Sequence, residues 1–314
     1  MVDDATELLD EAASGRRAAL ARLLSWVERG GDDARAVARA AHPRGGHAHV
    51  VGITGAPGAG KSTLTNALCG VARADEDRVA VLAIDPSSPF SGGAILGDRV
   101  RMGDHTLDPG VFIRSMATRG HLGGLALATP SAIRVLDAVG FPWVVVETVG
   151  VGQVEVEVVG SADTTVVVVN PGWGDAVQAN KAGLMEIADV FVINKADRAG
   201  AGETEQDLRQ MLSMRISDGW DPPVVSTVAH DGTGVGDLWA AVAAHRAWLT
   251  ETGELEARRR RRAGDELRGI VAALLEARAT ALARGEAFEV ARTTVWERRV
   301  DPWTAAEGLL GDAD

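Results

Sequence analysis

The sequence predicts an α/β fold built on a doubly wound, mostly parallel sheet, with helical extensions at both ends. Short β-branched, apolar runs alternate with longer helical patterns between residues 46 and 249. Several of these runs are apolar on both faces, as strands are when helices cover both sides of a parallel sheet. A glycine-rich segment also joins the first run directly to a helical stretch. This alternation is typical of a doubly wound α/β domain.

Seven apolar runs are the expected strands of this sheet. Each has the length of a strand, and helical stretches separate most of them. The runs are His49–Thr54, Arg78–Ile84, Val111–Arg114, Trp143–Thr148, Thr164–Asn170, Val190–Asn194 and Val224–Val228.

The two ends of the chain are predicted to be helical. Residues 4–42 carry leucines and alanines largely on one stripe, and a break at His42-Pro43-Arg44-Gly45-Gly46 ends an N-terminal extension over residues 1–45. Residues 250–314 form a C-terminal extension, with an amphipathic helix after the five-arginine run Arg258–Arg262 and a second helix over Asp301–Leu310. This region is too small for a core of its own, so it is expected to pack on the main domain or on another copy of the chain. Because acidic residues flank the arginine run, we interpret the run as a solvated helix face.

Composition excludes several classes of function. The 314 residues carry 32 Lys+Arg against 44 Asp+Glu, a net charge of −12, so we expect no nucleic-acid partner, since binding there depends on neutralising phosphates. A single cysteine, Cys69, excludes an internal disulfide framework and a multi-cysteine zinc or iron–sulfur site. No window approaches the ~20 apolar residues of a membrane span. The N-terminus is acidic rather than signal-like, so we expect a cytoplasmic protein without a membrane partner.

The strongest motif is a complete G-x-x-x-x-G-K-S between the first strand and a helix that begins near Ser62. Its glycines let backbone N–H groups turn inward around phosphate oxygens, and the helix N-terminus adds partial positive charge. The lysine is expected to reach the β- and γ-phosphates and the serine hydroxyl to bind Mg²⁺. The predicted phosphate-binding residues are Gly55, Ala56, Pro57, Gly58, Ala59, Gly60, Lys61, Ser62 and Thr63.

A second motif, Asn194-Lys195-Ala196-Asp197, follows the strand Val190–Asn194 and is expected to select the base. The Asp197 carboxylate can accept hydrogen bonds from both N1–H and the exocyclic amino group of guanine, whereas adenine offers no such pair of donors. Leaving a buried carboxylate unpaired is costly, so the motif predicts GTP rather than ATP.

Two carboxylates close neighbouring strands at the same predicted edge of the sheet. Asp85 follows the second strand and Glu147 ends the fourth, where carboxylates hold Mg²⁺ or its waters. Gly150 is placed to donate its N–H to the γ-phosphate. We expect hydrolysis to rely on Lys61, Asp85 and Glu147, with Asp85 the first candidate for orienting the attacking water.

These motifs, with several further segments, resemble the MeaB/ArgK-type G-proteins, the bacterial relatives of the methylmalonic aciduria type A protein. The segments are Gly55–Thr63, Asp85–Ser88, Gly97–Met102, Arg114–Gly120, Glu147–Gln153, Gly172–Gly183 and Asn194–Asp197. The resemblance implies a SIMIBI-class P-loop GTPase that acts as a chaperone of an adenosylcobalamin-dependent acyl-CoA mutase, usually methylmalonyl-CoA mutase. Such proteins gate cofactor loading, protect or reactivate the mutase, and dimerise through a C-terminal arm.

The resemblance also assigns roles to individual residues. It implies that Asp98 joins Ser62, Asp85 and Glu147 as an Mg²⁺-associated carboxylate. It implies that Gly172–Gly183 is an extra switch, with Asp175 and Lys181 as its charged members, and it groups Gln153 with the switch residues. Ser226, Thr227 and Val228 stand where the family's base-recognition turn usually has Ser-Ala, and Val154 replaces a small hydroxyl residue.

Two alternatives share the P-loop. A nickel-type metallochaperone GTPase would need several convergent Cys or His ligands, but Cys69 is expected to be buried in a helix, and His105 and His121 are isolated loop residues. An ATP-dependent kinase linked to amino-acid transport would have no use for a guanine-selective motif. The identity of the mutase stays open at this level.

Overall fold

The computed structural model describes residues 2–75, 77–85, 105, 108–117, 122–148, 160–172, 186–214 and 219–311. It divides into two compact units, Met1–Arg262 and Ala263–Asp314, which are described separately. The expected division into residues 1–45, 46–249 and 250–314 stays a prediction.

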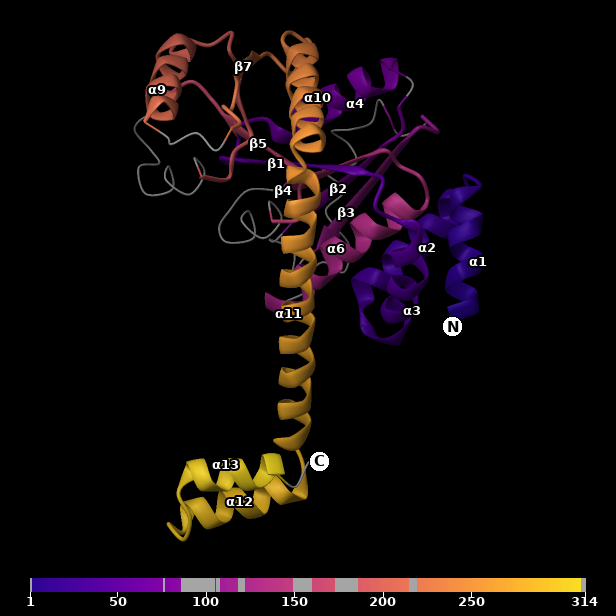
Figure 1. The fold of residues 1–314 in the computed structure, drawn as a ribbon, viewed down its shortest axis with the longest axis vertical. Coiled ribbons are helices and arrows are strands. Elements are labelled where there is room, and N and C mark those ends of the chain that lie inside the picture. The colour runs from indigo at the N-terminus through magenta and orange to yellow at the C-terminus, as the bar shows by residue number, and fades with distance from the viewer. Residues whose placement is uncertain are drawn as a thin grey trace. The chain divides into compact units, whose positions relative to one another are not determined.

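The first unit is built on a seven-stranded parallel sheet (Figure 1). Its strand order is β3-β2-β4-β1-β5-β6-β7, so the chain crosses over on both sides of the central β1. The predicted fold class is thereby confirmed, and all seven expected strands are present. Their bounds are β1 His49–Gly55, β2 Val79–Asp85, β3 Val111–Ala117, β4 Trp143–Thr148, β5 Thr164–Val169, β6 Val190–Asn194 and β7 Val224–Thr227.

Helices cover both faces of the sheet, which explains why its central strands are apolar on both sides. Every residue of β1, β4, β5 and β6 is buried. One hydrophobic cluster joins alternate strand residues to α6 (Leu122–Ala138), and a second joins the intervening strand residues to α4 (Lys61–Ala74) and α10 (Val235–Thr252). A smaller cluster places α9 (Ala201–Ser213) against β5 and β6.

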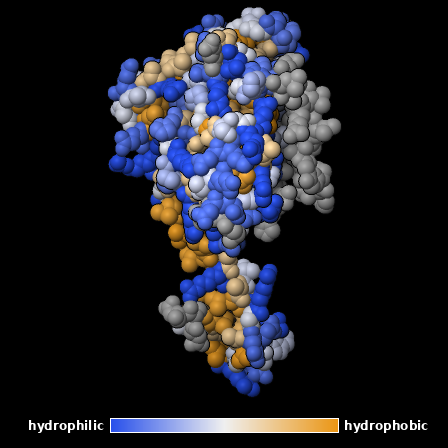
Figure 2. Space-filling model, turned by 90° about the vertical axis from the view of Figure 1, so that its right-hand side faces the viewer, coloured by the Kyte–Doolittle hydropathy of each residue, from blue (hydrophilic) through white to orange (hydrophobic). Residues whose placement is uncertain are grey.

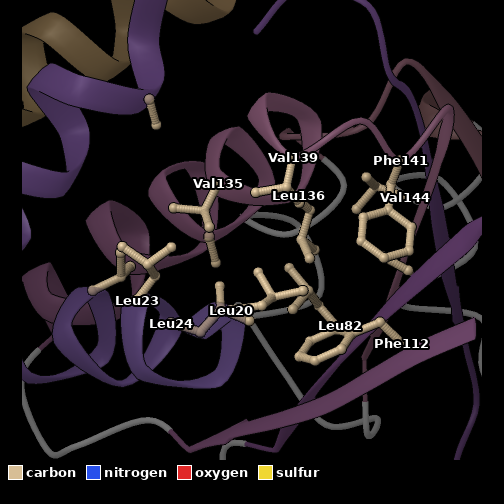
Figure 3. Close-up of a cluster of buried hydrophobic side chains, with 14 of the residues drawn as sticks. Leu20, Leu23, Leu24, Leu82, Phe112, Val135, Leu136, Val139, Phe141 and Val144 are labelled. Carbon is tan, nitrogen blue, oxygen red and sulfur yellow. The ribbon is translucent and has the colours of Figure 1, made fainter. Parts of the chain in front are cut away.

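The N-terminal extension is three helices rather than one continuous stretch. They are α1 (Val2–Ala13), α2 (Arg17–Arg29) and α3 (Gly31–Ala41), followed by a 3₁₀ turn over His42–Arg44. Their leucines share one core with α6 and the sheet, and Figure 3 shows Leu20 and Leu24 of α2 directed toward the same cluster as Val135 and Leu136 of α6. The predicted apolar stripe is therefore the face by which the extension packs on the sheet domain.

The arginine run lies in α11 (Glu254–Leu282), and the prediction that it is a solvated face is wrong for three of its five members. Arg260 and Arg261 are largely exposed, with side-chain exposures of 82% and 67%. Arg258, Arg259 and Arg262 instead pair with two buried aspartates that precede β5 and β6. Those partners lie about 70–100 residues away in sequence, and nothing in the arginine run itself points to them.

The second unit contains the rest of α11, α12 (Glu286–Trp296) and α13 (Pro302–Gly311), and α13 confirms the predicted second helix. None of the residues in these helices is buried. Figure 2 shows hydrophobic side chains exposed among polar ones on this unit. They are Leu267, Ile270, Val271, Leu274, Leu275, Val290, Trp296, Trp303 and Leu310. None of the helices in the described ranges is long and apolar enough to span a bilayer.

Candidate nucleotide site

The G-x-x-x-x-G-K-S segment connects β1 to α4, as the sequence predicts. Two of its glycines are required by close packing. A Cβ on Gly55 would lie 2.0 Å from the carbonyl oxygen of Val168, and Gly55 has φ +139°. A Cβ on Gly60 would lie 2.4 Å from Nδ2 of Asn194, and Gly60 has φ +90°. The loop therefore passes close to β5 and to the second motif, in backbone conformations that only glycine adopts at low cost.

Lys61 begins α4 and folds back over this loop. Its Nζ donates hydrogen bonds to the carbonyl oxygens of Gly55, at 2.6 Å, and Ala56, at 3.2 Å. The side chain is only 6% exposed. The ammonium group is thus held at the mouth of the loop, where it can exchange carbonyl oxygens for phosphate oxygens.

Ser62 and Glu147 bring two oxygen ligands together. The Ser62 hydroxyl donates to Oε1 of Glu147 at 2.5 Å, although the two residues are 85 positions apart. Glu147 is 1% exposed in β4 and is paired in register with Ile53 of β1. A hydroxyl and a carboxylate that meet beside a phosphate-binding loop fit Mg²⁺, which takes one or two protein oxygens and completes its shell with water and phosphate oxygens.

Of the other predicted acidic and switch residues, only Asp85 lies within the described residues. Asp85 is the last residue of β2, and its backbone lies in register with Ala117 of β3, one strand away from Glu147. This puts Asp85 at the same edge of the sheet as predicted. The remaining positions lie outside the described residues: Asp98, His121, Gly150, Gln153, Val154, Asp175 and Lys181.

The second motif is tied directly to the phosphate-binding loop. Asn194, 2% exposed at the end of β6, donates from Nδ2 to the carbonyl oxygen of Ala59 at 2.9 Å. Lys195 donates from Nζ to the carbonyl oxygen of Gly58 at 2.6 Å. Lys195 also has φ +60°, a left-handed conformation that is rare outside glycine and recurs at functional sites. Asp197 follows in an exposed turn, so its carboxylate is accessible to a base, and the expectation of a buried carboxylate at this position is wrong.

The predicted base-recognition turn lies beside this motif, and one of its contacts was missed by the sequence analysis. The hydroxyl of Thr227 and the backbone N–H of Ala229 both donate to Oδ1 of Asn194, each at 3.2 Å. Val228 closes the turn by donating its N–H to Thr233, whereas Ser226 is exposed. The contact from Ala229 is made by a backbone group, so no side-chain pattern could have revealed it.

The residues considered for a nickel site lie in other surroundings. Cys69 is 1% exposed in α4, as predicted, and burial raises the pKa of its thiol to about 12. The ring Nε2 of His105 contacts the carbonyl oxygen of Asn66 at 3.0 Å. Within the described ranges, no three His, Cys, Asp or Glu side chains converge as metal ligands.

Comparison with known proteins identifies the family. The family described as "Methylmalonyl Co-A mutase-associated GTPase MeaB" matches residues 20–284. A relative in Pyrococcus abyssi, named only as a GTPase, is 51% identical over 97% of this chain and 95% of its own. A fused isobutyryl-CoA mutase of Cupriavidus metallidurans is 39% identical over 70% of this chain, which corresponds to 21% of that larger protein. A crystal structure described as an LAO/AO transport system kinase is 27% identical, has a TM-score of 0.72, and covers 98% of this chain and 96% of its own.

In the candidate site, the phosphate-binding loop is joined by two hydrogen bonds to the segment that begins at Asn194. The family's description as a GTPase and the P-loop fold support nucleotide hydrolysis in general. The chain therefore belongs to the MeaB family of methylmalonyl-CoA mutase-associated GTPases.

Proposed function

We propose that this GTPase hydrolyses GTP in a Mg²⁺-dependent reaction and acts as a chaperone of an adenosylcobalamin-dependent acyl-CoA mutase, most simply methylmalonyl-CoA mutase. The observation that carries the mutase partner is the fused isobutyryl-CoA mutase, in which a segment 39% identical to this chain forms one polypeptide with a mutase. Proteins that act together are often found fused, so the fusion supports a separate mutase as the partner here. Gating of cofactor loading and protection of the mutase are the activities proposed for the complex.

In the proposed reaction, the chain supplies positioning and charge rather than covalent chemistry. Lys61 leaves the carbonyl oxygens of Gly55 and Ala56 and binds the β- and γ-phosphates. Ser62 and Glu147 would hold Mg²⁺, which neutralises charge on the phosphates. Asp85, at the end of the neighbouring strand, is the proposed residue for orienting the attacking water.

Base selection is assigned to Asp197, with Asn194 and Lys195 fixing the loop that carries it. Ser226, Thr227 and Val228 form the adjoining turn, to which Ala229 is now added. Asp98 is proposed, from the family resemblance, as a further Mg²⁺-associated carboxylate, and Gly150 is proposed to donate its N–H to the γ-phosphate. Gln153, Asp175 and Lys181 are proposed, from the same resemblance, to signal the nucleotide state to the mutase.

A second copy of this chain is the proposed partner of the second unit. Leu267, Ile270 and Leu274 recur at spacings of three and four along α11 and are 63%, 38% and 51% exposed. This is the spacing of a coiled-coil seam, and two copies related by a two-fold axis would present the same seam to each other. The homodimer therefore explains why a helical unit leaves its apolar side chains exposed.

The test is GTP hydrolysis by the full-length protein, alone and with a cobalamin-dependent mutase from the same source, with ATP in parallel and with Mg²⁺ added or chelated. We expect slow GTP turnover that needs Mg²⁺ and rises severalfold with the mutase. A rate of GTP hydrolysis that is the same with and without the mutase would refute the chaperone role. Preferential hydrolysis of ATP would favour a kinase.

The substitution Asp197→Asn tests base selection separately. Guanine presents an amino group to the Asp197 carboxylate, whereas xanthine presents a carbonyl oxygen that an asparagine amide can bind. We expect Asp197→Asn to lose GTP turnover and to gain xanthosine triphosphate turnover. Thr250→Ala, an exposed residue on α10, provides a surface control that should leave both activities unchanged.

A further inference from the structure

The edge of the sheet opposite the nucleotide site carries a buried charged network. Asp163 and Asp189 immediately precede β5 and β6, and they are 0% and 6% exposed. Because all strands run in parallel, these aspartates lie at the starts of the strands whose other ends reach the nucleotide site. The network has no part in the proposed reaction, yet it contains two carboxylates and three arginines.

Each aspartate extends the hydrogen bonding between two strands beyond their backbone ladder. Oδ2 of Asp163 accepts the N–H of Val50 in β1 at 3.0 Å, while its own N–H donates to the Val50 carbonyl oxygen at 2.7 Å. Oδ2 of Asp189 accepts the N–H of Thr165 in β5 at 2.8 Å, and its N–H donates to the Thr165 carbonyl oxygen at 2.9 Å. The two carboxylates thus fix β1 against β5 and β5 against β6.

Arginines of α11 hold these carboxylates in place. Arg258 forms a two-point ion pair with Asp189, with both N–O distances 3.0 Å. Arg259 binds Asp163 at 2.8 Å and also donates to the carbonyl oxygens of Gly46 and Ala48, in the segment that enters β1. Arg262 is a second partner of Asp163. A buried carboxylate with bidentate guanidinium partners is held in direction as well as in position.

The fixed strands are the ones that carry the two halves of the site. β1 ends in Gly55 and the phosphate-binding loop, whereas β6 ends in Asn194 and the guanine motif. β6 has only five residues, so Asp189 is about 17 Å from the motif along an extended strand. If the start of such a short strand changes direction, the guanine motif at its other end moves with it.

We propose that Asp163, Asp189 and the α11 residues Arg258, Arg259 and Arg262 are positioning residues that align the guanine motif with the phosphate-binding loop. The proposal rests on the proposed guanine specificity of the site. It also gives α11 an indirect role in nucleotide binding, because the three arginines lie on this helix.

The test compares Arg258→Ala with Arg260→Ala, a neighbouring arginine that is 82% exposed and pairs with Glu256 on its own helix. The affinities of the full-length protein for GDP and for inosine diphosphate are measured by calorimetry. Inosine diphosphate lacks the exocyclic amino group, so the affinity ratio reports the contact with Asp197. A ratio of affinities does not depend on the fraction of protein that is folded.

We expect Arg258→Ala to narrow the GDP preference by about threefold or more, since a misaligned carboxylate loses part of a charge-assisted hydrogen bond. Arg258→Lys keeps the charge but not the two-point geometry, so it should narrow the preference less; it also serves as the folded variant if Arg258→Ala fails to fold. Arg260→Ala should leave the preference unchanged. An unchanged preference in Arg258→Ala and Arg258→Lys, whatever their melting temperatures, would overturn the proposal.

Hydrogen exchange without nucleotide provides a second readout. The Ala196 N–H donates to Thr227 and the Ala229 N–H to Asn194, so both amides report the packing of the guanine motif. Faster exchange at these two amides in Arg258→Ala, with exchange in β2 unchanged, supports the proposal. Equal changes at all sites, or none at these two, would overturn it. If wild-type protein shows no guanine preference, the proposed base specificity fails, and the exchange experiment still decides the positioning role.

Discussion

Asn194 is the residue whose loss should affect stability and nucleotide binding together. The substitution Asn194→Ala removes three hydrogen bonds: one to the Ala59 carbonyl oxygen and two accepted from Thr227 and Ala229. A neutral hydrogen bond contributes about 1 kcal/mol net, and a buried donor left without a partner costs about 1–3 kcal/mol. Because Thr227 is 0% and Ala229 7% exposed, we expect the free energy of unfolding to fall by about 3 kcal/mol.

The assay is urea denaturation followed by circular dichroism, combined with GDP titration. We expect GDP affinity to fall about tenfold, which corresponds to about 1.4 kcal/mol, because the guanine motif is no longer tied to the phosphate-binding loop. Thr227→Val is the matched control: it removes one donor and should cost about 1 kcal/mol in wild type but less in the Asn194→Ala background. A loss below about 1 kcal/mol with GDP affinity unchanged would refute the reasoning.

Three further predictions concern groups away from the phosphates. Burial lowers the pKa of His49 from 6.5 to about 3, and the charges of Arg246 and Arg259 lower it further against the opposing charge of Asp163. Between these two pKa values the unfolded chain takes up a proton that the folded protein does not, so stability should fall by about 1.4 kcal/mol per pH unit as the pH is lowered from 6.5 toward about 3. His49→Gln should flatten this dependence in urea denaturation at about pH 6, 5 and 4. Cys69, with its pKa raised to about 12, should be unreactive toward a thiol reagent in buffer and should react within seconds in about 8 M urea. Rapid modification of the native protein would contradict its burial. Ile270→Glu combined with Leu274→Glu should convert a dimer into a monomer in light scattering without changing GTP turnover by the first unit, and a protein that is monomeric before substitution would refute the homodimer.

Much of the fold could be predicted because the sheet is buried on both faces. Residues such as Thr164–Val169 form a short β-branched run, and β-branched side chains pack well on a pleated surface. The phosphate-binding loop could be predicted because its glycines are demanded by backbone geometry, as the contacts of Gly55 and Gly60 show. Both patterns can be recognised within a few residues of sequence, although the groups that approach Gly55 and Gly60, on Val168 and Asn194, lie far away along the chain.

The buried charged network before β5 and β6 could not be predicted, because its members lie far apart in the sequence. Arg258, Arg259 and Arg262 resemble ordinary members of a charged helix, and Asp163 resembles a loop aspartate before a strand. These arginines and the aspartate come together only in the folded chain. Because Asp163 is buried, its charge is neutralised by the arginines and not by water. Burial opposes the ionisation of Asp163, but the hydrogen bond from Arg259 and the charges of Arg262 and Arg259 outweigh it and lower its pKa to about 2. A buried carboxylate that stays ionised needs these partners, so the arginine run is in part a structural requirement of the sheet.

The guanine motif shows how a selective residue depends on the residues that fix the backbone beside it. Asp197 is exposed, while Asn194 is fixed by three hydrogen bonds and Lys195 is held at φ +60° by its contact with Gly58. A left-handed backbone conformation at a lysine costs free energy, so it persists only where the surrounding contacts stabilise it. The Ala196 N–H, which donates to Thr227 at 3.0 Å, adds one more such contact. The backbone that leads into Asp197 is therefore fixed by these contacts. For this reason, substitutions at Asn194 or at the amino end of β6 should alter base preference.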